Sequence, residues 1–353
     1  MSVFSEAGQR RPSRAPTAIS LNTTMSLLCR LSTHLNTLER FQLRLDRKAE
    51  VIVRAEWNEE LRLGTVEKCG LEGVPVIIKE RLEEPYKVAD IRERVREEID
   101  EEDNYPYTHI LFEAMKREGI LDFEGIHILA SNGAIVDLTL GGCPNSRMTQ
   151  YCKRRIIGGT EFITISGRPL DNIYASRNYG HAFEEYLTVK ESSPTSSKLP
   201  IFAITKLTLG DLTILVKSEV DAKVNNDLIE IKCQPFPHLN SKHMLRKKIF
   251  RKAYLGKMRY VVFSGVAPGQ IGELPDSATF QPKPFDVDST VKMDAQFNKE
   301  FHRCQVICKK VLQLFKSHPH IDEIRIEKKW DEDEIHFVEV PVEEDDVKAE
   351  DSE

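Results

Sequence analysis

The sequence lacks the features that mark several large classes of protein. No stretch approaches the roughly 20 consecutive apolar residues that span a bilayer, and the first 30 residues lack the compact apolar core of a secretory signal. The seven cysteines are scattered without a CxxC pair, so neither a disulfide framework nor a zinc knuckle is indicated. The nucleotide-binding patterns GxGxxG and GxxxxGK are also absent. We therefore expect a soluble intracellular protein with reduced thiols and no membrane contact.

An excess of positive charge is also absent, at least overall. The 353 residues include 50 Lys and Arg against 56 Asp and Glu, and the formal net charge of −6 taken alone argues against a nucleic-acid binder. Residues 331–353, however, hold twelve acidic residues and one lysine, which leaves the preceding 330 residues with a net charge of +5. The body of the chain is therefore mildly basic.

The basic residues of the body gather in one acid-free window. No Asp or Glu occurs between Glu230 and Glu273. The basic residues of this window are Lys232, Lys242, Arg246, Lys247, Lys248, Arg251, Lys252, Lys257 and Arg259. An ordinary solvated helix face is one explanation, but the window directly follows a carboxylate cluster, so we expect a contact surface for a polyanion there.

Hydrophobic periodicity predicts an α/β protein with a mixed, largely antiparallel central β-sheet and flanking helices. Helical spacing is clear at residues 108–117 and 293–317. Strand-like runs cover residues 127–130, 134–140, 161–165, 212–224, 227–233, 259–266, 323–327 and 335–342.

The expected domain organisation is simple. Residues 1–30, which are basic and contain serine, predict a flexible N-terminal arm, with an organelle transit peptide as the alternative. Residues 31–342 predict a single domain, and residues 343–353 an acidic disordered tail.

Residues 212–233 (LTILVKSEVDAKVNNDLIEIKC) predict a β-hairpin that carries its charges on one face. Two consecutive asparagines at 225–226 suit a two-residue turn. That turn places Asp221 opposite Glu230 and Glu219 opposite Lys232, and cross-strand neighbours lie about 4.5 to 5.5 Å apart. Opposed carboxylates are destabilising unless a cation neutralises them, and a divalent metal is a natural candidate. An ordinary surface hairpin with salt bridges is the alternative.

The spacing of Asp, eight residues and Glu-x-Lys is typical of metal-dependent nucleases of the PD-(D/E)xK type. In such a site, two carboxylates hold one or two Mg²⁺ ions that polarise the scissile phosphate and acidify a bound water. The lysine orients or activates that water and offsets developing charge. The pattern therefore favours phosphodiester hydrolysis.

With the upstream segment NYGHAFEEYL at residues 178–187, the motifs resemble the decapping exonuclease (DXO) family in order and spacing. A Gly-x-x-Φ-Glu helix start is followed by Glu-x-Asp, Glu-Φ-Lys, a basic helix and the strand YVVFSGV. The matched motifs cover residues 179–266, and looser similarity covers residues 126–342. The resemblance implies a PD-(D/E)xK nuclease-like core and a hydrolase that removes incomplete or non-standard caps, including NAD caps, from RNA 5′ ends and degrades the RNA 5′ to 3′.

The resemblance also implies the site residues. The catalytic positions are Glu184, Glu219, Asp221, Glu230 and Lys232. The ligands of Mg²⁺ or Mn²⁺ are Glu184, Asp221, Glu230 and the carbonyl of Ile231. The substrate-binding positions are Glu219, Lys232, Lys248, Arg251 and Lys252. A helical wheel alone does not separate Glu184 from Glu185, and the family match selects Glu184.

Two departures from the family motifs leave more than one function open. The family has Trp-Arg-Gly after a strand, and the segment DLTLGGCP places Gly141 at the position of the substrate-contacting arginine. Lys252 stands where the family has a glutamine. These differences suit either a nuclease with changed 5′-end preference or a catalytically weakened RNA-binding or regulatory paralogue. DNA is a third possibility as substrate, because phosphate contacts carry little information on the sugar. We expect a nuclear or cytosolic protein, and the sequence does not identify a protein partner.

Overall fold

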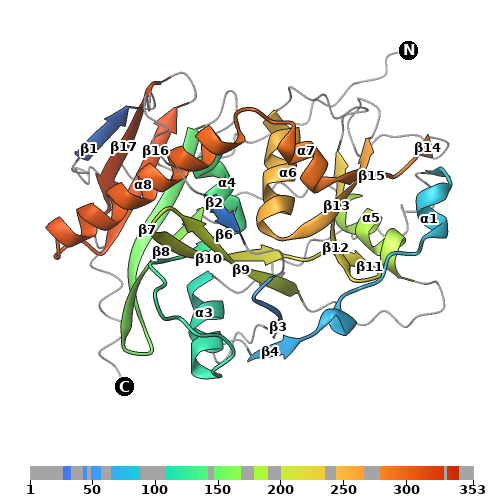
Figure 1. The fold of residues 1–353 in the computed structure, drawn as a ribbon, viewed down its shortest axis with the longest axis horizontal. Helices are drawn as coiled ribbons and strands as arrows, with labels where there is room; N and C mark the ends of the chain where they lie inside the picture. Colours follow the sequence, from blue (N-terminus) through green and yellow to red (C-terminus); the bar gives the residue numbers. More distant parts are fainter. Residues whose placement is uncertain are drawn as a thin grey trace, which may run out of the picture.

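The structure is a computed structural model that describes residues 27–32, 43–45, 49–56, 65–87, 89, 108–141, 147–167, 179–189, 200–234, 244–265, 279–329 and 332–341. The predicted basic arm lies outside these residues as far as residue 26, and its end belongs to strand β1 (Leu27–Ser32). The predicted acidic tail lies wholly outside them. No helix among the described residues is long and apolar enough to cross a membrane. Figure 1 shows the arrangement of the described elements.

The largest element is a mixed sheet. In the described part of the chain it has eleven strands, in the order β1-β17-β16-β7-β8-β6-β10-β9-β3-β4, with β2 beside β9. After β1 the bounds are β2 (Leu43–Leu45), β3 (Val51–Glu56), β4 (Thr65–Cys69), β6 (Ile128–Ser131), β7 (Arg147–Ile157), β8 (Thr160–Gly167), β9 (Ile201–Leu209), β10 (Leu212–Glu219), β16 (Glu323–Lys329) and β17 (Glu334–Glu339). Strand β6 is parallel to β8 and β10, whereas the other pairs are antiparallel. The predicted mixed, largely antiparallel sheet is therefore confirmed.

A smaller sheet carries the predicted hairpin. Its order is β11 (Ala222–Val224), β12 (Asp227–Gln234), β13 (Met258–Gly265) and β15 (Lys283–Asp286). A separate two-stranded pair joins β5 (Tyr86–Lys87) to β14 (Thr279–Phe280). The chain passes directly from β10 of the large sheet into β11 of the small one, so Val220 and Asp221 lie at the junction of the two sheets.

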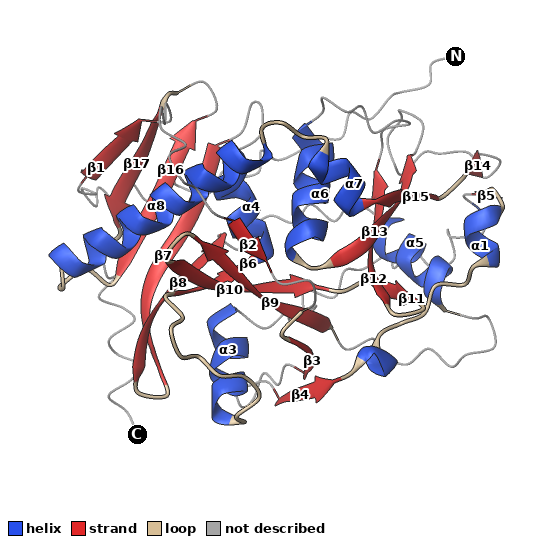
Figure 2. Ribbon diagram, viewed as in Figure 1, coloured by secondary structure: helices blue, strands red, loops and turns tan. Residues whose placement is uncertain are grey.

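Helices cover both faces of the large sheet. Their bounds are α1 (Glu80–Glu83), α3 (Thr108–Arg117), α4 (Asn132–Leu140), α5 (Tyr179–Thr188), α6 (Met244–Leu255), α7 (Val287–Lys292) and α8 (Phe297–Ser317), with a short 3-10 helix at Leu71–Gly73. Figure 2 shows α4 and α8 on one side of the sheet and α3 on the other. The predicted helices at residues 108–117 and 293–317 are confirmed as α3 and α8, although α8 begins four residues later than predicted.

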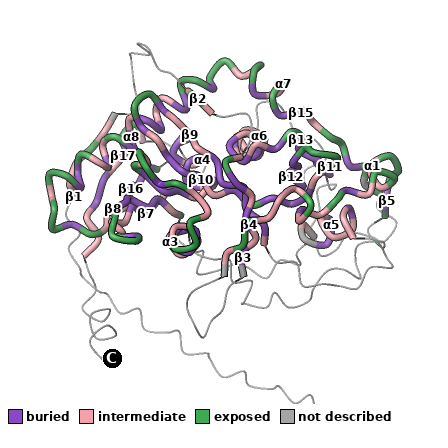
Figure 3. The backbone as a smooth tube through the Cα atoms, turned by 60° about the horizontal axis from the view of Figure 1, so that its bottom comes forward, coloured by how far each residue is buried: buried purple, intermediate pink, exposed green. Residues whose placement is uncertain are grey.

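Three apolar clusters hold these layers together. The largest joins the large sheet to α4, α6 and α8, a second packs α5 against β12, and a third packs α3 on the opposite sheet face. Each fully buried aliphatic or phenyl side chain contributes about 1.5 to 3 kcal/mol to stability. Figure 3 shows how much of β9, β10 and α4 is buried in the middle of the molecule. Residues at the junction of the two sheets are therefore attached to well-packed strands on both sides.

The predicted strand at residues 134–140 is wrong, because this segment forms helix α4. Ser131 caps the helix by accepting a hydrogen bond from the backbone N–H of Ala134, and Gly141 ends it with a φ of +73°. Almost every residue of α4 is buried, so its apolar run shows no helical stripe. A continuous apolar run of this length has the same appearance in a buried strand and in a buried helix.

The predicted strand at residues 212–224 is interrupted. Its first part, β10, continues along β9 as far as the pair Glu219 and Phe202, and its second part, β11, pairs with β12. The alternation of apolar residues survives the interruption because Val220 and Ala222 are both buried. Periodicity could therefore not reveal that one predicted strand serves two sheets.

Candidate active site

Three carboxylates converge on one ammonium group at the junction of the two sheets. The Lys232 Nζ atom lies 3.1 Å from Glu230 Oε1, 3.2 Å from Asp221 Oδ2 and 3.9 Å from Glu184 Oε1. Glu230 and Lys232 come from β12, Asp221 from the β10–β11 junction, and Glu184 from α5. The structure thus brings together four of the five residues predicted to be catalytic.

The hairpin register explains how Asp221 reaches this cluster. Strands β11 and β12 pair Ala222 with Ile229 and Val224 with Asp227, so the two asparagines form the turn as predicted. Asn225 has a φ of +53°, a conformation that asparagine tolerates better than most residues. The Asp221 Oδ2 atom accepts the backbone N–H of Ile231 at 2.6 Å, which fixes the carboxylate beside β12.

Glu219 does not lie opposite Lys232, in contrast to the prediction. The strand interruption leaves Glu219 on β10, where it pairs with Phe202 and its side chain is exposed. Its negative charge still acts on Lys232 and raises the pKa of the ammonium, after the larger effects of the three converging carboxylates. Glu219 therefore stands at the edge of the cluster and not within it.

Burial and charge act in opposite directions on the cluster. Asp221 is 8% exposed and Glu230 is 7% exposed. Burial raises the pKa of the Glu230 carboxyl group, the Lys232 ammonium opposes that rise, and Asp221 adds to it. Burial also disfavours the charged form of Lys232, but the surrounding carboxylates outweigh it and hold the pKa of Lys232 well above its ordinary value. The site therefore concentrates negative charge that requires a cation.

The chemistry of the donors fits a hard divalent cation, because Mg²⁺ and Mn²⁺ prefer carboxylate oxygens. Within the described ranges, no group of three or more His, Cys, Asp and Glu side chains is arranged to hold a metal ion. The carboxylates are instead arranged around the ammonium of Lys232.

The structure places Glu184, the glutamate that the family match selects, beside Lys232. Glu184 directs a carboxylate oxygen toward Lys232, and its side chain is 17% exposed. The buried face of α5 carries Phe183 and Leu187, which pack in an apolar cluster with Ile229 and Ile231 of β12. This packing places Glu184 at the edge of the apolar contact, beside the other carboxylates.

The acid-free window in sequence is not acid-free in space. Tertiary structure brings acidic residues from α4, from the end of β15 and from the α7–α8 segment to its basic residues. The ion pairs are Lys247 with Glu300 and Asp294, Lys248 with Asp137, Arg251 with Glu300 and Asp294, and Arg259 with Asp286 and Asp288. The window therefore does not present a uniform basic surface.

Two predicted substrate-binding residues of this window behave differently. Arg251, which was predicted to bind substrate, is 1% exposed, and its guanidinium binds Glu300 and Asp294. Lys252, the next residue, has no carboxylate within ion-pair distance among the described residues, and its charge acts on Glu230. Lys248 Nζ lies 2.8 Å from Asp137 Oδ1 and is thereby partly neutralised.

The assignment of Gly141 to the arginine position of the family is also corrected. Gly141 follows a helix, whereas the family motif follows a strand. Strand β6 ends at Ser131, and Asn132 and Gly133 follow it, so glycine stands in third place in Ser131-Asn132-Gly133 as in Trp-Arg-Gly. Asn132 therefore stands where the order of the Trp-Arg-Gly motif has its arginine, a match that the sequence reasoning missed because residues 134–140 were taken for a strand.

Asn132 forms hydrogen bonds with residues next to the candidate active site. Its side-chain Nδ2 donates to Ser218 Oγ and to the backbone carbonyl of Lys252, each at 2.8 Å. Its Oδ1 atom is buried and accepts no hydrogen bond within the described residues. An amide at this position cannot make the bidentate contact with phosphate that a guanidinium makes.

Comparison with known proteins identifies the fold. No family model matches the sequence, and no curated protein matches it. The structure of S. pombe Rai1 in complex with 3′-FADP is similar to this chain with a TM-score of 0.62 and 12% identity, over 89% of this chain and 99% of that one. Scheffersomyces stipitis Rai1, in complex with (3′-NADP)+ and calcium ion, gives 0.61 and 12% over 93% and 95%. Candida albicans Rai1, in complex with pU5-Mn2+, gives 0.60 and 9% over 88% and 93%.

These matches show that the chain has the fold of the Rai1 structures over almost its whole length. The resemblance to the decapping exonuclease family that the motifs indicated is therefore confirmed at the level of the fold. The low identity agrees with a divergent sequence.

Proposed function

We propose that the chain is a divalent-metal-dependent hydrolase of RNA 5′ ends, which removes incomplete or non-standard caps, NAD caps among them, and degrades the RNA from 5′ to 3′. The observation that carries the proposal is the convergence of Glu184, Asp221 and Glu230 around Lys232 in a chain with the Rai1 fold. The alternative of an ordinary surface hairpin does not explain why two of these carboxylates are almost fully buried.

Glu184, Asp221 and Glu230 are the side chains that would hold Mg²⁺ or Mn²⁺, with the carbonyl of Ile231 as a further ligand. The bound metal would polarise the phosphate and lower the pKa of a coordinated water. The residues of the chain then orient the reactants. The Asp221 carboxylate is held by the N–H of Ile231, and the Lys232 ammonium, 3.2 Å from that carboxylate, would orient a water between the carboxylates and the substrate.

The substrate class is supported by the relatives. Rai1 structures hold 3′-FADP, (3′-NADP)+ and pU5, which are dinucleotide and RNA ligands. In this chain, Lys252 and Lys248 are the cations of α6 that would contact substrate phosphates, with Glu219 at the edge of the cluster. Because Asn132 takes the place of the arginine, one guanidinium contact would be absent, which costs about 1.5 to 3 kcal/mol of substrate binding.

A second candidate is an RNA-binding or regulatory protein without turnover. It is favoured by the loss of the arginine at Asn132 and by the ammonium that already neutralises the carboxylates. It predicts RNA binding that is independent of divalent metal. DNA as substrate is tested in the same experiment with labelled DNA of the same sequence.

The experiment incubates 5′-labelled RNA, with an NAD cap or a 5′ monophosphate, with the protein and Mg²⁺ or Mn²⁺. Release of cap fragments or mononucleotides supports the proposal, and retention of that activity by Asp221→Asn with Glu230→Gln would contradict the site. Asp227→Asn is the matched control, because Asp227 is an exposed carboxylate on the turn of the same hairpin. RNA binding without release would support the second candidate. We also propose a nuclear or cytosolic location, which imaging of the tagged chain would test.

A further inference from the structure

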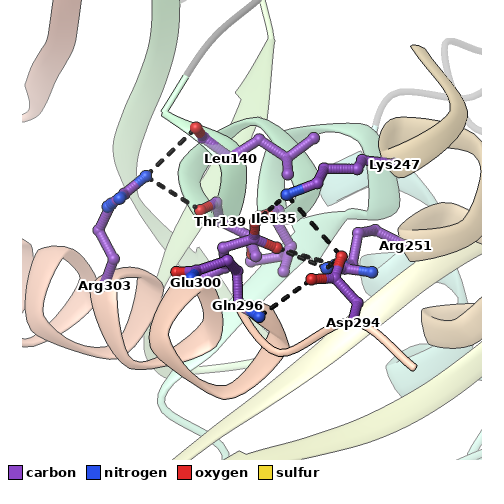
Figure 4. Close-up of polar contacts among 9 residues, drawn as sticks. All are labelled: Ile135, Thr139, Leu140, Lys247, Arg251, Asp294, Gln296, Glu300 and Arg303. Atoms are coloured by element: carbon purple, nitrogen blue, oxygen red, sulfur yellow. Dashed lines mark hydrogen bonds and ion pairs between the residues drawn. The ribbon is translucent and has the colours of Figure 1, made fainter. Parts of the chain in front are cut away.

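A buried network of charges ties α6 to the start of α8 (Figure 4). The Arg251 guanidinium lies 2.6 Å from Glu300 Oε2 and 2.6 Å from Asp294 Oδ2. Lys247, one helical turn earlier, lies 3.0 Å from Glu300 Oε1. Arg251 is 1% exposed and Glu300 is 7% exposed, and the guanidinium also stacks over the ring of Phe297. Two cations and two carboxylates thus balance one another, with Arg251 and Glu300 buried and Lys247 and Asp294 partly exposed.

The same face of α8 also holds α4. Three residues after Glu300, Arg303 Nη1 donates to the carbonyls of Leu140 at 3.2 Å and Thr139 at 3.4 Å. These are terminal carbonyls of α4, which have no partner within their own helix. Figure 4 shows Arg303 and Glu300 on α8, directed to α4 and α6 respectively.

The contact between α4 and α6 lies beside the candidate active site. Asn132, at the start of α4, donates to the carbonyl of Lys252 on α6 at 2.8 Å. Helices α4, α6 and α8 are therefore joined pairwise by polar contacts. The Lys252 side chain leaves α6 in a different direction from Arg251, since neighbouring residues of a helix are about 100° apart. It passes Gly133 and acts on Glu230.

We propose that Arg251 is a positioning residue that sets the place of Lys252 beside Glu230 by fixing α6 to α8. This inference rests on the proposed function, in which Lys252 contacts the substrate. A buried pair of apolar side chains would stabilise the same contact but would tolerate rotation and sliding of α6. The Nε and Nη2 atoms of Arg251 both donate to Glu300 Oε2, at 3.1 and 2.6 Å, and Nη2 also donates to Asp294 Oδ2. This set of contacts from one planar guanidinium fixes its orientation, and lysine, a point charge on a flexible stem, cannot reproduce it.

The test compares wild type with Arg251→Lys and with a matched control, Arg154→Lys. Arg154 of β7 also joins α8 to the large sheet, because it donates to the carbonyl of Phe315 on α8 at 2.9 Å and to Glu161 of the neighbouring strand β8 at 3.0 Å. Glu300→Gln weakens the same contact without a change in α6, and it replaces Arg251→Lys if that variant does not fold. Thermal unfolding sets an assay temperature at which every variant is folded.

The first readout needs no catalytic activity. An amine-reactive acylating reagent modifies lysines in the folded protein, and mass spectrometry gives the rate at Lys252 relative to exposed Lys316 of the same protein. Arg251→Lys is expected to raise this ratio about threefold or more, and Arg154→Lys to leave it unchanged. An unchanged ratio in Arg251→Lys, or an equal rise in both variants, would overturn the positioning role.

The second readout is a double-mutant cycle on labelled RNA. Arg251→Lys is expected to raise KM about fivefold in the wild-type background, and less than about twofold in the Lys252→Gln background, because the residue acts through Lys252. The same factor in both backgrounds would show a merely structural effect and overturn the proposal. A wild type that does not hydrolyse RNA contradicts the proposed function, and the labelling ratio then decides the role of Arg251 alone.

Discussion

The ammonium of Lys232 lies 3.2 Å from the carboxylate of Asp221, although the two residues come from different segments of an interrupted hairpin. The same carboxylate accepts the backbone N–H of Ile231. Asp221 is therefore held from two directions, and Lys232 balances a carboxylate cluster that would otherwise be buried without a counter-charge.

Removal of that counter-charge is expected to make the protein depend on divalent ions. Lys232→Met should lower the free energy of unfolding by roughly 3 kcal/mol, because breaking a buried ion pair leaves a charge uncompensated. Mn²⁺ should then raise the melting temperature of Lys232→Met more than that of wild type, since a ligand that binds only the folded state stabilises it. Thermal unfolding with and without Mn²⁺ measures both effects.

The control for this prediction removes a carboxylate as well. In Lys232→Met with Glu230→Gln the additional stabilisation by Mn²⁺ should become smaller. Equal shifts in wild type and Lys232→Met would argue that the three carboxylates do not form a cation site.

The unequal surroundings of Lys252 and Lys248 predict unequal roles in RNA binding. Lys252→Gln should weaken binding of single-stranded RNA and should lower the slope of log affinity against log salt by about 0.7, the contribution of one phosphate contact. Lys248→Gln should change the slope less, because Lys248 is paired with Asp137. Fluorescence anisotropy at several salt concentrations measures the slopes. A larger change for Lys248→Gln would reverse the assignment.

The end of α4 offers a test of the corrected fold assignment. Gly141 has a φ of +73°, and a Cβ atom there would lie 3.0 Å from Arg303 Nη1. Gly141→Ala should therefore lower the free energy of unfolding by about 1 to 2 kcal/mol. Gly133→Ala, within the first turn of the same helix, meets only Lys252 Cε at 3.9 Å and should be neutral or stabilising. Urea denaturation compares the two, and equal losses would contradict the assigned end of the helix.

His109 predicts a loss of stability in mild acid. Burial, together with Arg155, Lys153 and Lys217, lowers the pKa of His109 from 6.5 to about 4. The folded protein thus keeps this imidazole neutral while the unfolded chain takes up a proton as the pH falls below 6.5, so its contribution to stability is lost between about pH 6.5 and 4.

His109→Gln should accordingly lose less free energy of unfolding between pH 7 and pH 5 than wild type does. Denaturant titrations at the two pH values give the difference, and identical pH dependence in wild type and His109→Gln would show that His109 is not the group responsible.

Local patterns were sufficient for the parts of the molecule that local interactions determine. The bounds of α3 and the turn at Asn225 follow from periodicity and turn chemistry, and the structure agrees with both. The motif match placed Glu184, Asp221 and Glu230, which the structure brings together around Lys232. These features depend on residues that are close in sequence or on a shared spacing.

What sequence could not reveal depends on distant residues. The basic window looked uncompensated because its acidic partners, such as Asp137 and Glu300, lie far away in the chain. Helix α4 looked like a strand because burial on all sides removes the helical stripe, and that error led the motif match to Gly141, at the end of the helix. Tertiary ion pairs in the first case and tertiary burial in the second produced features that local sequence patterns do not contain.

The most direct test of the central claim is the anomalous scattering of Mn²⁺ in crystals of the wild-type protein. The account predicts a single strong peak within coordination distance, about 2.0 to 2.3 Å, of carboxylate oxygens from Glu184, Asp221 and Glu230. A peak elsewhere, or no peak while Lys232 keeps its three carboxylate contacts in the presence of saturating Mn²⁺, would contradict the proposed metal site.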